Sequence, residues 1–244
     1  MPSDPQVKPL ALVTGAAIRL GREIALALAD EGYAIGLHYH QSAEQAHELS
    51  RHLQDKGAPV VLLQADLTKP EQIERIFDQV STSGYPLKVL INSAAVMHAG
   101  NLDETSIEDW DATFDLNLRA PWLCAHHAAH LMKDNGVIIN ITDAASGRPW
   151  KEHAAYSVSK AGLEALTRIL ACTLAPGIRV NAVAPGLVLP APGFPDDKWR
   201  RLVERLPAKK SGTPEDIVRT VLFLIQNEYI TGQTLAVDGG YQLT

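Results

Sequence analysis

Cysteine is scarce in this chain, and long apolar runs are missing. Cys124 and Cys172 are the two cysteines among 244 residues, and both fall inside apparent helices, so we expect reduced thiols and no disulfide framework. No run approaches the ~20 apolar residues that a membrane-spanning helix needs. The first residues also lack the charged and then apolar pattern of a secretory signal. We therefore expect a cytoplasmic protein without a membrane segment.

An excess of positive charge is missing as well. The formal net charge is −6, which argues against nucleic acids and anionic membrane surfaces as partners. The hydrophobic content of 46% and the charged content of 20% are ordinary for a globular domain. At this length we expect one α/β domain with a sizeable core.

Strand and helix patterns alternate along the chain. The patterns predict strands over residues 10–13, 34–39, 60–64, 89–92, 137–142, 179–184 and 234–237, and helices near residues 21–29, 43–56, 70–81, 112–133, 155–174 and 214–226. Such alternation indicates a parallel sheet with helices on both faces. We predict an α/β fold with a doubly wound seven-stranded sheet of the Rossmann type, in a single domain over residues 10–244 after a flexible arm at residues 1–9.

The segment at residues 187–207 interrupts this alternation. It is rich in proline and contains one glycine. Its position before the last predicted helix suggests a mobile substrate lid, and a passive surface loop is the alternative.

A glycine-bearing turn follows the first predicted strand. Thr14-Gly15 begins the turn, and Gly21 lies at the start of the next helix. Gly15 permits a sharp turn, and Gly21 permits close approach of a pyrophosphate to the helix N-terminus. Strand, glycine turn and helix together predict a dinucleotide site.

Tyr156 and Lys160 are four residues apart on one predicted helix. Residues at this spacing share a helix face, and a nearby ammonium favours the ionised phenol. We therefore expect Lys160 to lower the pKa of Tyr156, so that the pair passes a proton at neutral pH. An exposed tyrosine beside a solvated lysine is the plainer interpretation of the same spacing.

With these motifs, the chain resembles the short-chain dehydrogenase/reductase family over nearly its whole length. Arg19 departs from the pattern, because a middle glycine is usual there. The resemblance implies that Asn117 helps to place Lys160 and a proton-carrying water chain. Further matching motifs are Asp66-Leu67, Asn92-Ser93-Ala94-Ala95, Asn117, Asn181 to Gly186, and Asp238-Gly239-Gly240.

The end of the second predicted strand has no carboxylate. An acid there would bind the ribose hydroxyl of NAD, whereas His40, Gln41 and Ser42 are hydrogen-bond donors that suit the 2′-phosphate of NADPH. For Ser42 the alternative is helix capping alone, and for His40 a plain polar strand end. We expect NADP(H) as the cofactor, and the motifs with the resemblance assign it Gly15, Arg19, Leu20, Gly21, His40, Gln41, Ser42, Asp66, Leu67, Asn92, Ala94, Tyr156, Lys160, Pro185, Gly186 and Val188.

Asp143 lies thirteen residues before Tyr156, where the family usually has a serine. This aspartate, Arg19 and the stretch from Leu37 to His40 resemble the pteridine reductase branch. An ionised carboxylate only accepts hydrogen bonds, so Asp143 donates a proton only if its pKa is raised. Two alternatives are that Asp143 merely accepts backbone N–H bonds, and that Thr142 replaces the usual serine.

The resemblance therefore implies an NADPH-dependent reductase with Asp143, Tyr156, Lys160 and Asn117 as catalytic residues. The expected substrate is a pterin or dihydropterin. The alternatives are ketones or 3-oxoacyl thioesters, and a catalytically silent NADPH-binding regulatory protein.

Other features leave the details of the pocket and the assembly open. The aromatic residue that stacks on pterins in the pteridine reductase branch is replaced by Met97, and Trp150 is a second candidate for that contact. A threonine common after the nicotinamide motif is also missing. The histidines show no metal-ligand spacing, so no metal is expected. By resemblance, the helices at residues 112–133 and 155–174 pair copies of the chain into a homodimer or homotetramer.

Overall fold

The computed structural model describes residues 7–101, 103–132, 134–148 and 150–244. Its strands are β1 (Leu10–Val13), β2 (Ala34–Tyr39), β3 (Val60–Gln64), β4 (Leu87–Asn92), β5 (Gly136–Ile141), β6 (Ile178–Pro185) and β7 (Thr234–Val237). Its helices are α1 (Arg19–Asp30), α2 (Ala43–Asp55), α3 (Pro70–Thr82), α4 (Ile107–Phe114), α5 (Ala120–Leu131), α6 (Ala154–Leu174), α7 (Asp196–Arg205) and α8 (Pro214–Gln226), with a π-helical turn at Asp115–Arg119 and a 3₁₀ turn at Tyr241–Leu243.

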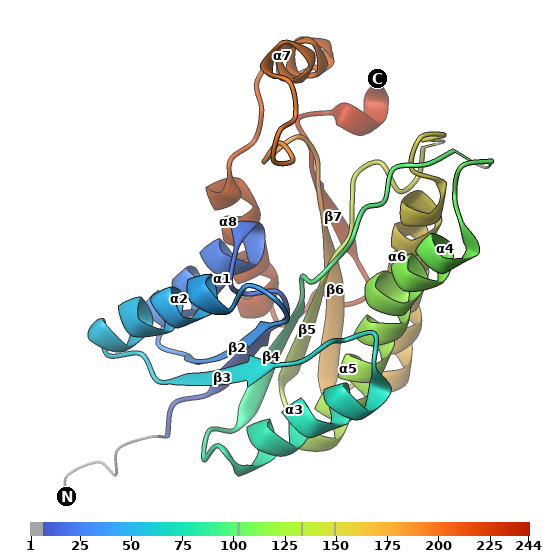
Figure 1. Cartoon of the computed structure of the whole chain (residues 1–244). Coiled ribbons are helices and arrows are strands. Elements are labelled where there is room, and N and C mark those ends of the chain that lie inside the picture. Colours follow the sequence, from blue (N-terminus) through green and yellow to red (C-terminus); the bar gives the residue numbers. More distant parts are fainter. Residues whose placement is uncertain (1–6, 102, 133, 149) are drawn as a thin grey trace, which may run out of the picture.

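The strands form one parallel sheet in the order β3-β2-β1-β4-β5-β6-β7. Figure 1 shows α1, α2 and α8 on one face of this sheet and α3, α5 and α6 on the other. The strand order reverses between β1 and β4, and such a switch point opens a crevice at the carboxyl ends of the strands. The predicted doubly wound fold in a single domain is confirmed.

Apolar side chains explain why the helices cover both faces. Every residue of β1, β2 and β5 is buried, as expected for parallel strands with helices on each side. One core cluster packs α1, α2 and α8 on the sheet, and a second packs α3, α5 and α6 on the opposite face. The two clusters fix the positions of the central strands, at whose carboxyl ends the crevice lies.

The predicted helix at residues 112–133 is helical from residue 107 to residue 131, but it is divided by a π-helical turn. The structure has α4, the π-helical turn and α5 in its place, and residue 133 lies outside the described residues. Pro121 has no N–H to donate to the carbonyl of Asn117 four residues earlier, so a regular α-helix cannot continue there. The chain instead widens at Asp115–Arg119, a change that is often found at functional sites.

The predicted lid at residues 187–207 contains a helix that the sequence analysis missed. α7 begins directly after Pro195 and none of its residues is buried, although Trp199, Leu202 and Val203 are partly covered. Figure 1 shows α7 standing apart from the sheet, above the carboxyl ends of the strands. The prolines of this segment indicated a loop, although Trp199, Leu202 and Val203 have the spacing of one helix face.

The predicted arm at residues 1–9 is only partly within the described residues, since residues 1–6 lie outside them. Of the remainder, Lys8 donates from Nζ to the carbonyl of Gly57 over 3.0 Å. Within the described ranges, no helix has the length and apolar character to cross a membrane. In the same part of the chain, Cys124 is buried in α5 and Cys172 is exposed on α6, both as free thiols.

Candidate active site

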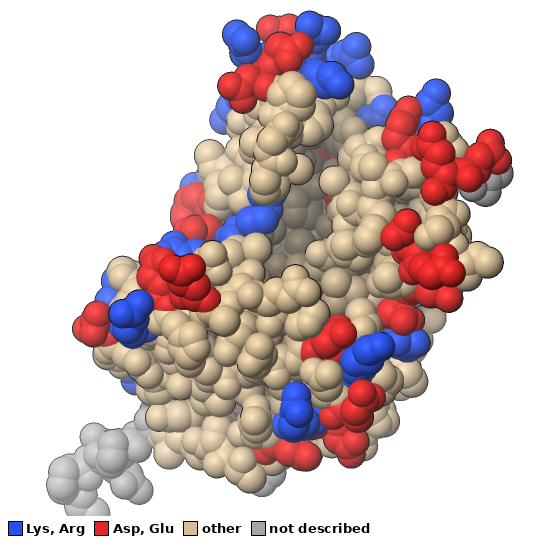
Figure 2. All heavy atoms as spheres, viewed as in Figure 1, with Lys and Arg blue, Asp and Glu red and all other residues tan. Residues whose placement is uncertain are grey.

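A cavity of about 810 Å³ opens at the carboxyl ends of the central strands. Figure 2 shows the hollow beneath α7, with uncharged residues forming most of its walls and charged side chains on the outer side of α7. The cavity brings together residues of β2, β5, β6, α1, α4, the π-helical turn and α6 with residues of the segments that follow β1, β3, β4 and β6. Its lining includes most of the predicted site residues: Gly15, Arg19, Leu20, Gly21, His40, Gln41, Ser42, Asp66, Leu67, Ala94, Asp143, Tyr156, Lys160, Pro185, Gly186 and Val188.

The glycine turn forms one wall of this cavity. Gly15 has φ +66°, a left-handed conformation that favours glycine. A Cβ added to Gly21 would lie 2.2 Å from the carbonyl oxygen of Gly15, so only glycine lets α1 begin this close to β1. The first turn of α1 contains no acidic residue, so its N–H groups form a site suited to a phosphate anion. These features fit a dinucleotide.

Arg19 lines the cavity, but its guanidinium is held by the segment after β6. Nη2 donates to the carbonyl of Leu189 over 3.0 Å, and Nη1 donates to that of Pro190 over 3.2 Å. Arg19 also has φ +52°, the conformation for which a glycine would be the ordinary residue. The side chain therefore connects the glycine turn to the predicted lid.

The end of β2 presents polar groups to the cavity and no carboxylate. His40, Gln41 and Ser42 all line it. Ser42 occupies the N-cap position of α2 without a side-chain capping bond, so its hydroxyl is not used in the way that the capping alternative required. On the neighbouring strand end, Oδ1 of Asp66 accepts hydrogen bonds from the N–H and the hydroxyl of Thr68. Hydrogen-bonding side chains after β2 and the carboxylate of Asp66 after β3 thus lie at the ends of two adjacent strands.

Asp143 and Tyr156 meet inside the cavity. The hydroxyl of Tyr156 donates to Oδ2 of Asp143 over 2.7 Å, while Oδ1 of Asp143 accepts the N–H of Ala145 over 2.7 Å. Asp143 therefore accepts a backbone bond and also contacts the tyrosine. The hydroxyl of Thr142 donates instead to the carbonyl of Val183 over 3.2 Å. Asp143, and not Thr142, occupies the place beside the phenol.

Burial raises the pKa of Asp143 above its usual range, although hydrogen bonds from Ala145 and Tyr156 and the charges of Lys160 and His153 oppose this shift. The condition for proton donation by Asp143, a raised pKa, is therefore met. A carboxyl group with a raised pKa keeps its proton to a higher pH and can donate it.

Lys160 lies deeper in the same cavity, with only 3% of its surface exposed. Its Nζ donates to the carbonyl of Ile141 over 2.8 Å and lies 5.8 Å from the ring centroid of Tyr156. Burial lowers the pKa of Lys160 to about 8, against the opposing effect of the Asp143 carboxylate. The prediction that Tyr156 and Lys160 share one helix face is correct, because both side chains line the cavity from α6.

The expected lowering of the Tyr156 pKa is wrong for this arrangement. The pKa of Tyr156 is raised well above 10 by burial, by the negative charge of Asp143 and by their hydrogen bond. The ammonium of Lys160 is bound to a backbone carbonyl, whereas the carboxylate of Asp143 is only 2.7 Å from the phenol oxygen. The phenol thus holds its proton and acts as a donor.

Asn117 lies beside this group of residues in the π-helical turn. Its Nδ2 donates to the carbonyl of Val96 over 2.8 Å and to Oγ of Ser159 over 3.1 Å, while its Oδ1 accepts the N–H of Val96. Asn117 is fully buried. Asn117 therefore fixes the segment after β4 against α6. Its contact on α6 is Ser159, the residue before Lys160.

Asn92 is not among the described residues that line the cavity, which corrects its assignment to the cofactor. Its Nδ2 donates to Oδ1 of Asn140 over 2.8 Å, and Asn140 donates in turn to Thr167 of α6 over 2.9 Å. Asn92 and Asn140 are register partners of β4 and β5, so the side chain bonds across the sheet.

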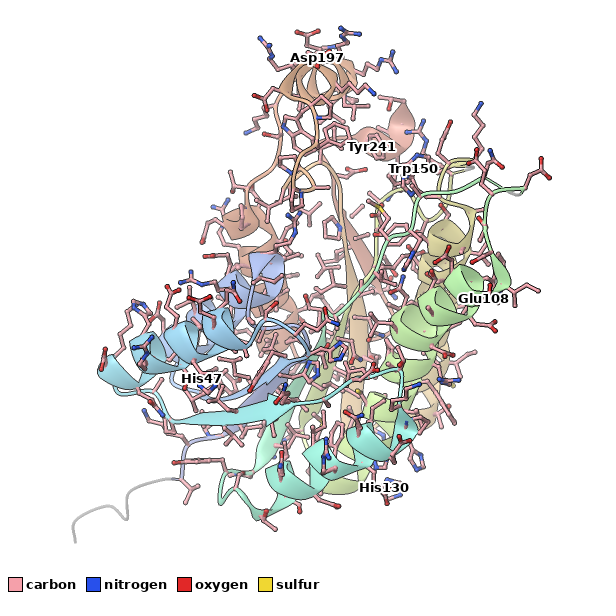
Figure 3. All side chains as sticks on the ribbon, viewed as in Figure 1. His47, Glu108, His130, Trp150, Asp197 and Tyr241 are labelled. Atoms are coloured by element: carbon pink, nitrogen blue, oxygen red, sulfur yellow. The ribbon has the colours of Figure 1, made fainter. Side chains whose placement is uncertain are left out.

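Met97 and Trp150 lie outside the cavity lining as the described residues define it. Met97 is 44% exposed. The ring of Trp150 meets that of His153 edge-on at 4.3 Å and that of Tyr156 at 6.4 Å, measured between centroids. Figure 3 places Trp150 at the upper rim of the hollow, with Tyr241 beside it. The tryptophan approaches the reactive tyrosine more closely than the sequence could indicate.

Several lining residues were not assigned to the site from the sequence, namely Ala17, Ile18, His38, Tyr39, Thr68, Ser93, Ala95, Val96, His98, Ala112, Leu116 and Ile141, whereas Thr142 was an alternative to the usual serine and Leu189 lies in the predicted lid. His38 carried a usable signal, because it is a polar residue within an otherwise apolar buried strand. Among the described residues, no group of three or more histidine, cysteine or acidic side chains is arranged to hold a metal ion.

Comparison with known proteins shows which family the chain resembles over nearly its whole length. The model of the family described as enoyl-(acyl carrier protein) reductase matches residues 15–242. A 3-oxoacyl-[acyl-carrier-protein] reductase of Staphylococcus epidermidis is 36% identical over 239 residues, covering 94% of this chain and 97% of the relative. Among solved structures, FolM alternative dihydrofolate reductase 1 of Brucella suis, in complex with NADP, has a TM-score of 0.91 at 31% identity, covering 97% and 96% of the two chains. A blue fluorescent protein from a metagenomic library, in complex with NADPH, has a TM-score of 0.91 at 33% identity, covering 98% and 99%.

The chain belongs to the short-chain dehydrogenase/reductase family. It is an oxidoreductase of that family, and its overall fold is that of its structural relatives.

Proposed function

We propose that this protein is an NADPH-dependent reductase that acts on a pterin or dihydropterin. The observation that carries the proposal is the 2.7 Å hydrogen bond between the Tyr156 hydroxyl and Asp143, the residue where the family usually has a serine. The similar folate-reducing FolM of Brucella suis supports the substrate class, and its bound NADP supports the cofactor.

The cofactor site is composed of the glycine turn, the start of α1 and the ends of β2 and β3. NADPH, when bound, supplies the hydride. The residues of this chain hold it: the turn at Gly15 and the N-terminus of α1 receive the pyrophosphate, and His40, Gln41 and Ser42 receive the 2′-phosphate. A carboxylate at the end of β2 would repel that phosphate, and none is found in residues 38–42.

Proton supply is the task of the Asp143–Tyr156 pair. The substrate's C=N bond needs a proton on nitrogen when its carbon accepts hydride. A carboxyl group with a raised pKa and a protonated phenol both donate, and the two share one hydrogen bond. The ammonium of Lys160, held by the Ile141 carbonyl, counters the negative charge left on the pair.

A second candidate is the reduction of ketones or 3-oxoacyl thioesters. The 3-oxoacyl reductase of Staphylococcus epidermidis, at 36% identity, favours this activity. A carbonyl oxygen also needs one proton, which Tyr156 alone could deliver. A catalytically silent regulatory protein is the remaining alternative, and any hydride transfer from NADPH would eliminate it.

A substrate panel with a matched variant separates these functions. We expect the wild-type protein to reduce dihydropterins faster than 3-oxoacyl thioesters, with a rate that rises as the pH falls, because more Asp143 is then protonated. In the variant Asp143→Ser, which restores the family's usual residue, we expect pterin reduction to fall by about 100-fold while any carbonyl reduction is kept. NADPH oxidation followed by absorbance measures both.

Equal loss of both activities in Asp143→Ser would contradict a specific role in pterin reduction. Faster thioester reduction by the wild-type protein would favour the second candidate. A higher kcat/KM with NADH than with NADPH would refute the phosphate site at the end of β2.

We also propose that residues 187–207 form the lid over this cavity. Arg19 anchors the segment through the carbonyls of Leu189 and Pro190, and α7 overhangs the hollow. A cytoplasmic location and a homotetramer stay predictions from the sequence.

A further inference from the structure

His38 is an imidazole enclosed between two strand ends on the adenosine side of the cavity. It lies in β2, which pairs with β1 on one side and with β3 on the other, and it is only 2% exposed. Its Nδ1 accepts the N–H of Gly15 over 3.0 Å, and its Nε2 lies 3.1 Å from the carbonyl oxygen of Ala65. One side chain thus contacts the segments that follow β1 and β3.

These two bonds fix the form of the imidazole. A neutral imidazole has one acceptor and one donor nitrogen. Gly15 contributes an N–H, so Nδ1 must accept, and Nε2 carries the hydrogen that it donates to the carbonyl of Ala65. In a protonated ring Nδ1 would also carry a hydrogen, and this N–H would point at the N–H of Gly15. Burial, with a smaller effect of His40, lowers the pKa of His38 to about 4, so the ring is neutral under ordinary conditions.

The two contacted segments form opposite sides of the cofactor region. Gly15 is the residue at which the glycine turn reverses, with φ +66°. Ala65 immediately precedes Asp66 and Leu67, which line the cavity beyond the end of β3. The backbone of His38 joins the same connection, because its carbonyl accepts the N–H of Ala16 over 2.8 Å. The imidazole therefore sets how far apart the pyrophosphate turn and the adenine-side segment lie.

We propose that His38 is a positioning residue for the cofactor, which holds the glycine turn and the Ala65–Asp66 segment at the separation that the adenosine half of NADPH requires. The proposal rests on NADPH as the cofactor in the proposed function. His38 does not take part in proton transfer, because Gly15 and Ala65 use both ring nitrogens. Its effect is on the affinity for the adenosine and phosphate part of the molecule.

Binding measurements on three variants test this role without any substrate. His38→Leu removes both bonds at similar volume, and His38→Asn keeps an acceptor near the position of Nδ1 for the Gly15 N–H. His52→Asn, at an exposed histidine of α2, is the control. We measure the Kd of NADPH by its fluorescence, the Kd of adenosine 2′,5′-bisphosphate by calorimetry, and the melting temperature of each protein alone.

In His38→Leu we expect both Kd values to rise by about tenfold and by the same factor, which is the effect of ~1.4 kcal/mol from losing one or two hydrogen bonds. His38→Asn should recover part of this loss but not all of it, because the bond to Ala65 stays lost, and His52→Asn should bind as the wild type does. The common factor for the two ligands is the signature of a role on the adenosine side.

Wild-type affinity in His38→Leu would overturn the proposal, and so would a loss confined to NADPH with the bisphosphate unaffected. If His38→Leu does not fold, His38→Asn decides: its lost bond to Ala65 should still raise both Kd values, and unchanged values would refute the role. A wild-type protein that binds no NADPH would instead refute the proposed function, along with the role that rests on it.

Discussion

At the scale of single residues, the hydroxyl of Tyr156 has one carboxylate as its partner and holds its proton. Its pKa is raised well above 10, chiefly by burial and then by Asp143. The family resemblance identified the tyrosine, lysine and aspartate, but it did not indicate that the carboxylate would bond the phenol while the ammonium bonds a backbone carbonyl. That difference depends on side-chain directions and on burial, neither of which is encoded in sequence spacing.

Removing that hydroxyl gives the most direct prediction for a residue. In Tyr156→Phe, we expect kcat to fall by at least about 100-fold, because a proton donor is lost, while the Kd of NADPH changes by less than about twofold. Steady-state rates and a fluorescence titration with NADPH provide the two measurements. Tyr229→Phe is the control, since Tyr229 is fully exposed far along the chain from the pair.

A rate for Tyr156→Phe within threefold of the wild-type rate would mean that Asp143 alone supplies the proton. The tyrosine would then be a structural partner of the carboxyl group.

At the scale of elements, the glycine turn was accurately predicted because its constraint is steric and local. Gly15 and Gly21 are separated by six positions, and the contact between them follows from one turn and one helix start. The break at Asp115–Arg119 was not predicted, although Pro121 was visible. A proline in the first turn of a helix is compatible with a continuous apolar pattern, so the pattern concealed the boundary. α7 was missed because it is short and directly follows a stretch with three prolines, which indicated a loop.

Substituting Gly21 tests the packing of α1 on β1. In Gly21→Ala the new Cβ would lie 2.2 Å from the Gly15 carbonyl oxygen, and backbone has to move. We expect a stability loss of about 1–3 kcal/mol and a clear loss of NADPH affinity. Thermal unfolding and the NADPH titration measure these effects.

Gly147→Ala is the matched control for that substitution. A Cβ on Gly147 meets nothing within 4 Å, so the protein should unfold and bind NADPH as the wild type does. If Gly21→Ala behaved like this control, the close contact between α1 and the turn would not be required.

At the scale of the whole molecule, the doubly wound parallel sheet of seven strands was predicted from the alternating strand and helix patterns, whereas the order of its strands comes from the structure. Burial on both faces, right-handed crossovers and the strand-order reversal are general physical consequences of such patterns. The surface was harder to predict. α5 and α6 bear exposed apolar side chains, among them Trp122 at 49% and Ile169 at 62%.

These two side chains give a prediction for the assembly. We expect light scattering to find a mass that is a multiple of the 26.5 kDa chain, because exposed apolar helix faces are commonly covered by another copy. The double variant Trp122→Asp and Ile169→Asp should reduce that mass, and Val7→Asp, outside these helices, should not. A monomeric wild-type protein would contradict the predicted homotetramer and homodimer alike.

The position of Lys160 also determines how the protein responds to reactive small molecules. Burial lowers the pKa of Lys160 to about 8, so its amine loses its proton at a lower pH than the ~10.4 usual for a lysine in water. An unprotonated amine is a nucleophile, and this one is reached only through the cavity. Mild acylating agents should therefore inactivate the enzyme by modifying this lysine before the others, and an occupied cofactor site should protect it.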